Sequence, residues 1–312
     1  MRKASYSVSI DKLRVCLNAS TDIYNYLKDH YTRYNNEGNR VLDEDNFTLT
    51  FIEEDEHTMR ATLDMRDVGC YYRLGTFTFS NSAKYEGKAF FSFDNSALYR
   101  IYMRQYNGEP INHICDFQMV CEFYGLEFNN ITEIELALDS DYNYIKKVRS
   151  MIKNIDRYDL IINGRRVTND ETLDGYGEYY SRSRVQLSKM PTLYFSQAKE
   201  TDMKMRVYDK ARELSESSPY KMEMMKEWLG WSDISKLYRV EVVMHNTNVR
   251  EFMGRYGDKL VGDFGEHWNI LNLLNSEEFR LAMLLDSAER MIYFHDRKSN
   301  EHISLVEVAT GI

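Results

Sequence analysis

The sequence predicts an α+β fold, built on a largely antiparallel, curved sheet with helices packed on one face and an open, polar face on the other. Strand-like runs in which apolar and polar residues alternate recur along the chain. Helical stretches that carry an apolar stripe lie between these runs. Short acidic or Asn/Gly turns join several runs directly, which favours antiparallel neighbours.

The composition is that of a globular protein. Of the 312 residues, 43% are hydrophobic and 29% are charged, and this length fits one large domain or two ordinary ones. We expect two halves, 1–130 and 131–312. No run of about 18 apolar residues occurs, and the N-terminus lacks the apolar core of a signal peptide, so we expect no membrane partner and a cytoplasmic location. The four scattered cysteines favour neither a disulfide framework nor a zinc site.

The N-terminal half is predicted to be an α+β scaffold, and DNA recognition is one use that it could serve. A helix from Ser20 or Thr21 to Tyr34 follows a first strand, and Pro110 opens a second helix that Gly125 closes. Alternation between these helices predicts an antiparallel meander. The predicted strands are 11–17, 47–52, 58–65, 71–79 and 88–93, with a further candidate at 99–103.

The second half contains four more predicted strands, at 131–139, 191–196, 204–210 and 238–245. Helices are predicted at 142–156 and 220–229, and Asn163-Gly164 predicts a tight hairpin turn. The helical region 264–288 has long apolar stripes. We expect it to cap the back of the sheet, with a partner-binding helix as the alternative.

The charge distribution is uneven. The chain carries a net charge of −9, which opposes binding to nucleic acid, yet residues 145–212 contain 15 Lys/Arg against 9 Asp/Glu. Within this region, Gly175 to Lys189 interleaves tyrosines with Arg182, Arg184 and Lys189. Such a segment could stack and neutralise single-stranded nucleic acid, or it could be an ordinary amphipathic hairpin.

Three of the predicted strands carry acids, bases and a phenol on one face, because side chains alternate along a strand. If the strands share one sheet, these side chains crowd its open face, and carboxylates there repel one another. Plain hydration or a bound cation must offset that repulsion. The polar positions are Glu133, Glu135, Asp139, Arg206, Tyr208, Lys210, Arg239, Glu241 and His245.

This arrangement suits phosphate chemistry. Carboxylates from neighbouring strands are the ligands that Mg²⁺ or Mn²⁺ prefers, and such a metal polarises a phosphodiester. Tyr208 lies between two cations, where its hydroxyl could hydrogen-bond a phosphate oxygen or attack phosphorus. The alternative is a half-buried strand whose tyrosine only packs its ring.

Three motifs, in this order, resemble the core of a known family. They are I-T-E-I-E-L-A-L-D at 131–139, T-L-Y-F-S-Q and M-R-V-Y-D-K-A-R-E within 192–213, and Y-R-V-E-V-V at 238–243. The resemblance is to the replication initiation factor family, which comprises Rep_trans-type rolling-circle plasmid initiators and related relaxases of conjugative elements. It implies a metal-dependent enzyme that nicks and joins DNA at specific sites through a covalent phosphotyrosine.

The resemblance implies a role for five residues. The family's nucleophile corresponds to Tyr208 and its lysine to Lys210, while its acidic strand residues correspond to Glu135, Asp139 and Glu241 as ligands of Mg²⁺ or Mn²⁺.

Six basic residues are candidates for contacts with DNA phosphates. They are Arg206, Lys204, Arg239, Arg182, Arg184 and Lys189.

The chain departs from the family's pattern in two places. Glu133 and Glu135 stand where an arginine and an aspartate are usual, and Ser196 and Gln197 stand where a glycine and an arginine are usual.

The predicted function is therefore initiation of rolling-circle replication on origin DNA with a single-stranded or cruciform nick site. The chain lacks a G-x-x-x-x-G-K-[ST] motif, so a host helicase is the expected partner for unwinding, and a homodimer is left open. The alternatives are a relaxase of the same chemistry, a non-catalytic DNA-binding regulator with the same fold, and a structural protein whose polar face binds another protein.

Overall fold

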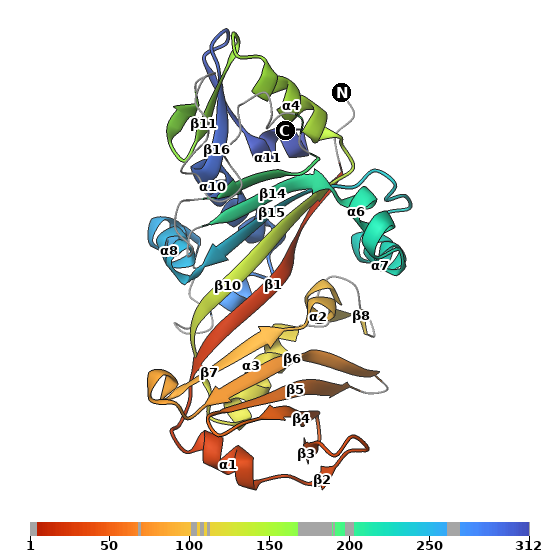
Figure 1. The fold of residues 1–312 in the computed structure, drawn as a ribbon, viewed down its shortest axis with the longest axis vertical. Coiled ribbons are helices and arrows are strands. Elements are labelled where there is room, and N and C mark those ends of the chain that lie inside the picture. The colour runs from red at the N-terminus through yellow and green to blue at the C-terminus, as the bar shows by residue number, and fades with distance from the viewer. Residues whose placement is uncertain are drawn as a thin grey trace. The chain divides into compact units, whose positions relative to one another are not determined.

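The chain forms two compact units, each assembled from segments that are distant in sequence. The computed structural model describes residues 5–67, 70–100, 105–106, 109–110, 113–167, 189, 191–196, 203–260 and 269–311 (Figure 1). Unit 1 comprises Met1–Ile10, Glu135–Leu260 and Ser276–Ile312, and unit 2 comprises Asp11–Ile134 and Val261–Asn275. Two long strands, β1 (Tyr6–Asn18) and β10 (Glu127–Ser140), contribute residues to both units.

The predicted α+β class is confirmed, with a large, curved, antiparallel sheet accompanied by helices. The two units differ from the simple division into 1–130 and 131–312. The first residues of β1 belong to unit 1 together with most of the second half, and residues 261–275 belong to unit 2. Strand pairing between distant segments produces this arrangement, and such pairing is not visible as a boundary in the sequence.

Unit 2 contains the predicted meander. Its neighbouring strands pair antiparallel. In sheet order after β1 they are β7 (Lys88–Phe93), β6 (Cys70–Ser80), β5 (Thr58–Asp67), β4 (Phe47–Glu54), β3 (Arg40–Asp43) and β2 (Arg33–Tyr34). The shorter elements of this unit are α1 (Ile23–Asp29), a 3-10 turn η1 (Ala83–Tyr85), α2 (Asn95–Arg100), β8 (Gln105–Tyr106), β9 (Glu109–Pro110), α3 (His113–Phe123) and α9 (Asn269–Leu273).

Aromatic residues form the core of unit 2. Phe117 of α3 packs on the sheet, with its ring centroid 4.5 Å from that of Phe91 and 4.9 Å from that of Phe93. Phe77 lies 4.5 Å from Phe91, and both rings are fully buried. Alternation along β6 and β7 places these rings on one face, so a single helix suffices to cover them.

Two predictions for unit 2 are wrong in detail. The first helix ends at Asp29 instead of Tyr34, and Tyr31 and Tyr34, which lie beyond its end, are exposed. The predicted strand at 99–103 overlaps α2, which ends at Arg100. The Asp94 carboxylate accepts hydrogen bonds from the Ser96 backbone N–H and hydroxyl, and this N-terminal cap favours a helical turn.

Unit 1 contains the strands on which the polar motifs lie. Their order is β13 (Leu193–Ser196), β14 (Lys204–Asp209), β15 (Tyr238–His245), β10 and β1. A second sheet has the order β12 (Arg165–Val167), β11 (Tyr158–Ile162), β16 (Ile292–Asp296) and β17 (Glu301–Ser304). The helices of this unit are α4 (Tyr144–Lys153), α6 (Lys210–Ser217), α7 (Tyr220–Leu229), α8 (Asn246–Leu260), α10 (Glu277–Met291) and α11 (Leu305–Thr310).

The hairpin turn predicted from Asn163-Gly164 is present between β11 and β12. Both residues have positive φ, 49° and 74°, as a two-residue turn of this type requires. The Asn163 side chain donates a hydrogen bond to the Ser196 backbone oxygen at 3.0 Å, so the turn also contacts β13.

Helix α10 covers the apolar back of the sheet in unit 1, as predicted, whereas α9, the other described helix within 264–288, belongs to unit 2. The Ser287 hydroxyl lies 2.9 Å from the sulfur of Met244 on β15, and both side chains are buried. Buried Arg280 donates to the Val8 backbone oxygen on β1 at 2.8 Å. The Ser276 hydroxyl caps the helix by accepting a hydrogen bond from the Phe279 backbone N–H. No helix among the described residues is both long and apolar enough to cross a bilayer.

Gly75 provides a test of the packing in unit 2. It faces Phe93 of β7, and a Cβ at this position would lie 2.3 Å from the Ser92 backbone oxygen and 2.6 Å from the Phe91 ring. We expect Gly75→Ala to lower the free energy of unfolding by about 2 kcal/mol, because backbone atoms must shift to accept the methyl group. Urea unfolding followed by circular dichroism measures this loss.

The matched control is Gly254→Ala in α8, where the glycine is exposed and a Cβ would meet nothing within 4 Å. That change removes a poor helix former, so it should leave stability unchanged or raise it by up to about 1 kcal/mol. Equal unfolding midpoints for the two variants would contradict the close approach of β6 and β7 at Gly75.

Candidate functional site

Polar residues from separate motifs converge on three neighbouring strands of unit 1. Strands β14 and β15 pair antiparallel, with Arg206 opposite Glu241 and Tyr208 opposite Arg239, and β10 lies on the other side of β15. Because side chains alternate along each strand, the polar positions fall on one face. We call the following residues the polar cluster: Glu135, Asp139, Arg206, Tyr208, Arg239 and Glu241.

Tyr208 donates a short hydrogen bond to Glu241. The distance from the tyrosine hydroxyl to Glu241 Oε1 is 2.5 Å, and Tyr208 is only 9% exposed. Burial raises the pKa of Tyr208 well above its usual value; Arg239 acts in the opposite direction, while Glu241 and its hydrogen bond raise the pKa further. The hydroxyl is therefore protonated at neutral pH, and Glu241 is the group placed to accept its proton.

Glu241 is ionised despite its burial. Burial acts to raise the pKa of this carboxyl, but Arg239, Arg206 and the Tyr208 hydrogen bond together hold it below its usual range. Arg206 Nη2 lies 2.5 Å from Glu241 Oε2 and 2.6 Å from Glu135 Oε1. One guanidinium therefore joins carboxylates from two strands, and 44% of the Arg206 side chain remains exposed.

Asp139 has a different role from the metal ligand that the sequence predicts. Its two oxygens accept hydrogen bonds from Arg239 Nε and Nη2 at 2.8 and 2.7 Å, and both residues are fully buried. Arg239 Nη1 also lies 3.3 Å from Glu241 Oε1. Arg239 was expected to contact DNA, but its burial leaves it no access to a phosphate. Its planar, bidentate geometry instead compensates Asp139 inside the protein.

The polar face is covered at Arg239 and Asp139 and partly exposed at Arg206, whereas the sequence predicts an open face. Met225 of α7 places its sulfur 3.9 Å from Arg239 Nη2, and Tyr144 of α4 is fully buried. The Tyr144 ring packs edge-on against that of Tyr238 on β15, with centroids 6.3 Å apart. Burial raises the pKa of Tyr144. Among the described residues, its hydroxyl has no hydrogen-bond partner.

Lys210 lies beside Tyr208, although it is not on the strand. It begins α6, because the Asp209 carboxylate caps that helix by accepting the Arg212 backbone N–H at 3.0 Å. Lys210 Nζ pairs with Glu213 at 2.7 Å and lies 5.6 Å from the centre of the Tyr208 ring. The lysine therefore remains close to the phenol, from a helix N-terminus.

A cavity of about 520 Å³ gives access to the edge of the polar cluster. Arg206 and Tyr208 line it, together with Asn143, Arg149 and Tyr238. The Asn143 side chain donates to the Tyr238 hydroxyl at 2.8 Å, so α4 and β15 are joined at the cavity wall. Tyr208 is thus buried from bulk solvent on most sides but faces a space that a ligand could enter.

Glu135 and Glu241 belong to an acidic group that could hold a metal ion. Their ligand oxygens lie within 4.8 Å of each other. Buried Glu241 Oε2 accepts no hydrogen bond from the described residues and has only its ionic contact with Arg206. Carboxylate oxygens suit Mg²⁺, which completes its coordination with water. Arg206 pairs with both carboxylates in this structure.

The remaining predicted site residues lie outside the polar cluster. Lys204 begins β14 and is exposed, and Lys189 is an exposed turn residue. Arg182 and Arg184 lie outside the described residues, as does most of the segment 175–189. Sequence reasoning did not assign a site role to Asn143, Arg149 or Tyr144. The signal available for these three was only their position on and before the helix that follows the acidic strand.

Comparison with known proteins adds no family. No protein-family model matches this chain, and no curated protein gives a significant match. The resemblance to replication initiation factors stays a prediction that rests on the three motifs.

The Asp139–Arg239 pair can be tested by replacing first one partner and then both with apolar residues. Arg239→Met alone leaves Asp139 buried without its guanidinium, so the free energy of unfolding should fall by about 3 to 5 kcal/mol. Adding Asp139→Leu removes the uncompensated charge and should recover most of that loss. Chemical unfolding of the two single variants and the double variant gives the coupling energy. Additive losses would contradict a direct pair.

Proposed function

We propose that this protein is a metal-dependent enzyme that nicks and rejoins DNA, acting as an initiator of rolling-circle replication with Tyr208 as its nucleophile. The observation that carries the proposal is the 2.5 Å hydrogen bond from the Tyr208 hydroxyl to Glu241, at the wall of a cavity that Arg206 also lines. This arrangement combines a nucleophile, a base to receive its proton and a cation for phosphate. The three motifs and their order provide independent support.

In the proposed reaction, Tyr208 Oη attacks a phosphorus atom of the DNA backbone and its proton passes to Glu241. A bond between phosphorus and tyrosine oxygen forms, and the bond from phosphorus to the adjacent sugar oxygen breaks. The leaving oxygen takes a proton from water and becomes a free hydroxyl at the nick. Attack by a DNA hydroxyl on the phosphotyrosine reverses these steps and rejoins the strand.

Arg206 and Lys210 neutralise the phosphate in this proposal. Arg206 pairs with Glu135 and Glu241, while its side chain is 44% exposed and lines the cavity. A phosphate would replace the carboxylates as its partner. Loss of Arg206 from Glu241 also makes that carboxylate a stronger base, because a guanidinium beside it stabilises its ionised form.

The metal ion of the proposal is Mg²⁺ or Mn²⁺, and Glu135 and Glu241 would hold it. Bound there, the ion would supply charge neutralisation and polarisation of the phosphodiester. Asp139 is left out of the ligand set because Arg239 occupies both of its oxygens.

A conjugative relaxase would use the same chemistry on a different DNA target. A non-catalytic DNA-binding regulator is the second candidate, and one observation favours it. Arg206 and Arg239 already form ion pairs with all three carboxylates of the polar cluster. These ion pairs reduce the repulsion among the carboxylates without a metal ion. A purely structural network would require the same.

A covalent-adduct assay tests the proposed function. Wild type and Tyr208→Phe are incubated with supercoiled and single-stranded DNA that includes the sequence flanking the gene, in Mg²⁺, Mn²⁺ or EDTA. We expect an SDS-resistant protein–DNA band that requires metal and is absent from Tyr208→Phe. Tyr194→Phe and Tyr238→Phe are the matched controls and should retain the band. Binding without any adduct would support the regulator instead.

Competition between Arg206 and the metal gives a second test, which needs no DNA. Removing the guanidinium by Arg206→Gln removes a positive charge 2.5 Å from Glu241 Oε2. We expect Mn²⁺ to bind about tenfold more tightly, a change of about 1.4 kcal/mol. Glu241→Gln should abolish binding. Electron paramagnetic resonance of free Mn²⁺ measures both.

The control for this test is Arg212→Gln. Arg212 lines the same cavity but pairs with Glu216 at 2.8 Å, so its loss should leave Mn²⁺ affinity within about twofold of wild type. Equal effects of the two substitutions would show that only net charge matters and would remove Arg206 from the metal position.

A further inference from the structure

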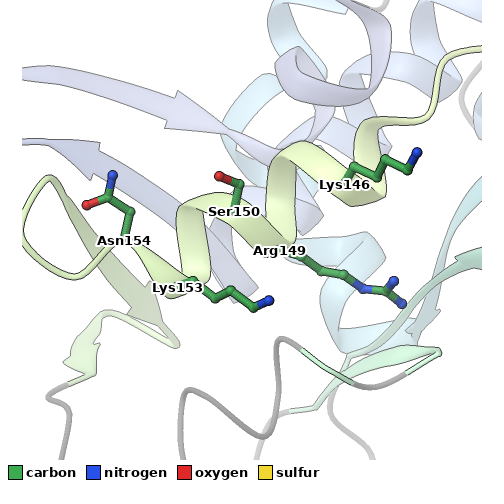
Figure 2. Close-up of a pocket in the computed structure, with 5 residues that line it drawn as sticks. All are labelled: Lys146, Arg149, Ser150, Lys153 and Asn154. Atoms are coloured by element: carbon green, nitrogen blue, oxygen red, sulfur yellow. The ribbon is translucent and has the colours of Figure 1, made fainter.

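Helix α4 carries a surface of positive charge that the polar cluster does not use. Its sequence contains Lys146, Lys147, Arg149 and Lys153 and no acidic residue. Three of these, Lys146, Arg149 and Lys153, line a hollow of about 500 Å³ together with Ser150 and Asn154 (Figure 2). Among the residues that the structure describes, no acidic one lines this hollow, and the spacing of three and four residues puts the cations along one helical face.

These cations have few protein partners. In the part of the chain that the structure describes, no carboxylate forms an ion pair with Lys146 or Lys153, and both lysines are exposed. Arg149 is held in place, because its Nη2 donates to the Pro191 backbone oxygen at 3.1 Å. Partial burial lowers the pKa of Arg149, so an anion beside it would stabilise its charged form.

The basic surface continues into the cavity at Tyr208. Lys146 and Arg149 line both spaces, and the cavity adds Arg206 to the series. The α6 side of the cavity does not carry the same excess of positive charge. Glu213 and Glu216 lie there and pair with Lys210 and Arg212. A polyanion entering the cavity would thus be attracted along α4 and not along α6.

The dimensions suit one nucleic-acid strand. From Lys146 to Lys153 the helix rises about 10 Å, enough to follow two successive phosphates. The cavity of about 520 Å³ has room for one or two unstacked nucleotides and is far too small for a duplex. Tyr194, which faces Arg206 across β13 and β14, contributes an aromatic ring to the cavity wall, where a base could stack.

We propose that the Lys146, Arg149 and Lys153 face of α4 binds the phosphate backbone of single-stranded DNA on its way to Tyr208. The inference rests on the proposed function for the role of Tyr208 at the end of this path. Binding along α4 is measurable without cleavage, so the two claims can fail separately.

Fluorescence anisotropy with a labelled twelve-nucleotide oligothymidine, across NaCl concentrations from about 50 to 300 mM, tests this path. The variant Lys146→Ala/Lys153→Ala removes two exposed cations that form no ion pair with any described residue. We expect at least tenfold weaker binding at the lowest salt. The slope of log affinity against log salt should fall by about 1.4, because each single-strand phosphate contact contributes about 0.7.

The matched control is Lys221→Ala/Lys236→Ala, which removes the same charge from exposed positions of unit 1 outside both hollows. Its salt slope should equal that of wild type. If wild type forms no covalent adduct but the α4 variant still weakens binding, the nuclease function is rejected and the DNA path along α4 is kept.

Three results would overturn the proposal. The first is no binding of the oligonucleotide by wild type at low salt. The second is equal binding by the α4 variant and the control variant. The third is binding of anionic phosphatidylglycerol vesicles in place of DNA, with the same dependence on Lys146 and Lys153. The last result would reassign the surface to lipid headgroups.

Discussion

The buried contact of Arg239 with Asp139 is the constraint on which the rest of unit 1's polar layer depends. Both side chains are fully buried, and two parallel hydrogen bonds at 2.7 and 2.8 Å join β15 to β10 through them. Burying a guanidinium costs free energy unless its N–H groups donate hydrogen bonds. The register of β10 and β15 must therefore keep Asp139 beside Arg239 where α7 covers them. Glu241 also shares Arg239, and through Glu241 the pair influences the pKa of Tyr208.

The polar cluster therefore contains one enclosed cation and one partly exposed cation. Arg239 is enclosed and pairs with Asp139 and Glu241, whereas Arg206 pairs with Glu135 and Glu241 from a partly exposed position. Three carboxylates face two guanidiniums, which leaves an excess of one negative charge when Tyr208 is protonated. A divalent cation or a phosphate would change the partners of Arg206 without disturbing Arg239. The layer can thus accept a ligand while the part that stabilises the fold stays unchanged.

The sequence predicted the positions of the strands better than the helices that cover them and the side chains that they contact. Alternation located β15 at Tyr238–His245 and put Arg206, Tyr208 and Glu241 on one face, because strand period is a local property. It could not show that α4 and α7 cover this face, since two helices with apolar stripes can pack on either side of a sheet. The metal-ligand role of Asp139 came from the family resemblance. The strand pattern gives the face that Asp139 occupies, but not which of two arginines it meets.

Helix α4 connects the buried layer with the surface. Its apolar side, including Tyr144, Val148 and Ile152, is buried, while Lys146 and Lys153 are exposed. Asn143 caps the helix and also bonds Tyr238 on β15, so the helix start is fixed to the strand that carries Arg239 and Glu241. A strand of DNA held by the exposed cations would be positioned by the same packing that encloses the polar cluster. The distance from a bound phosphate to Tyr208 is then set by the core of unit 1 and not by flexible surface groups.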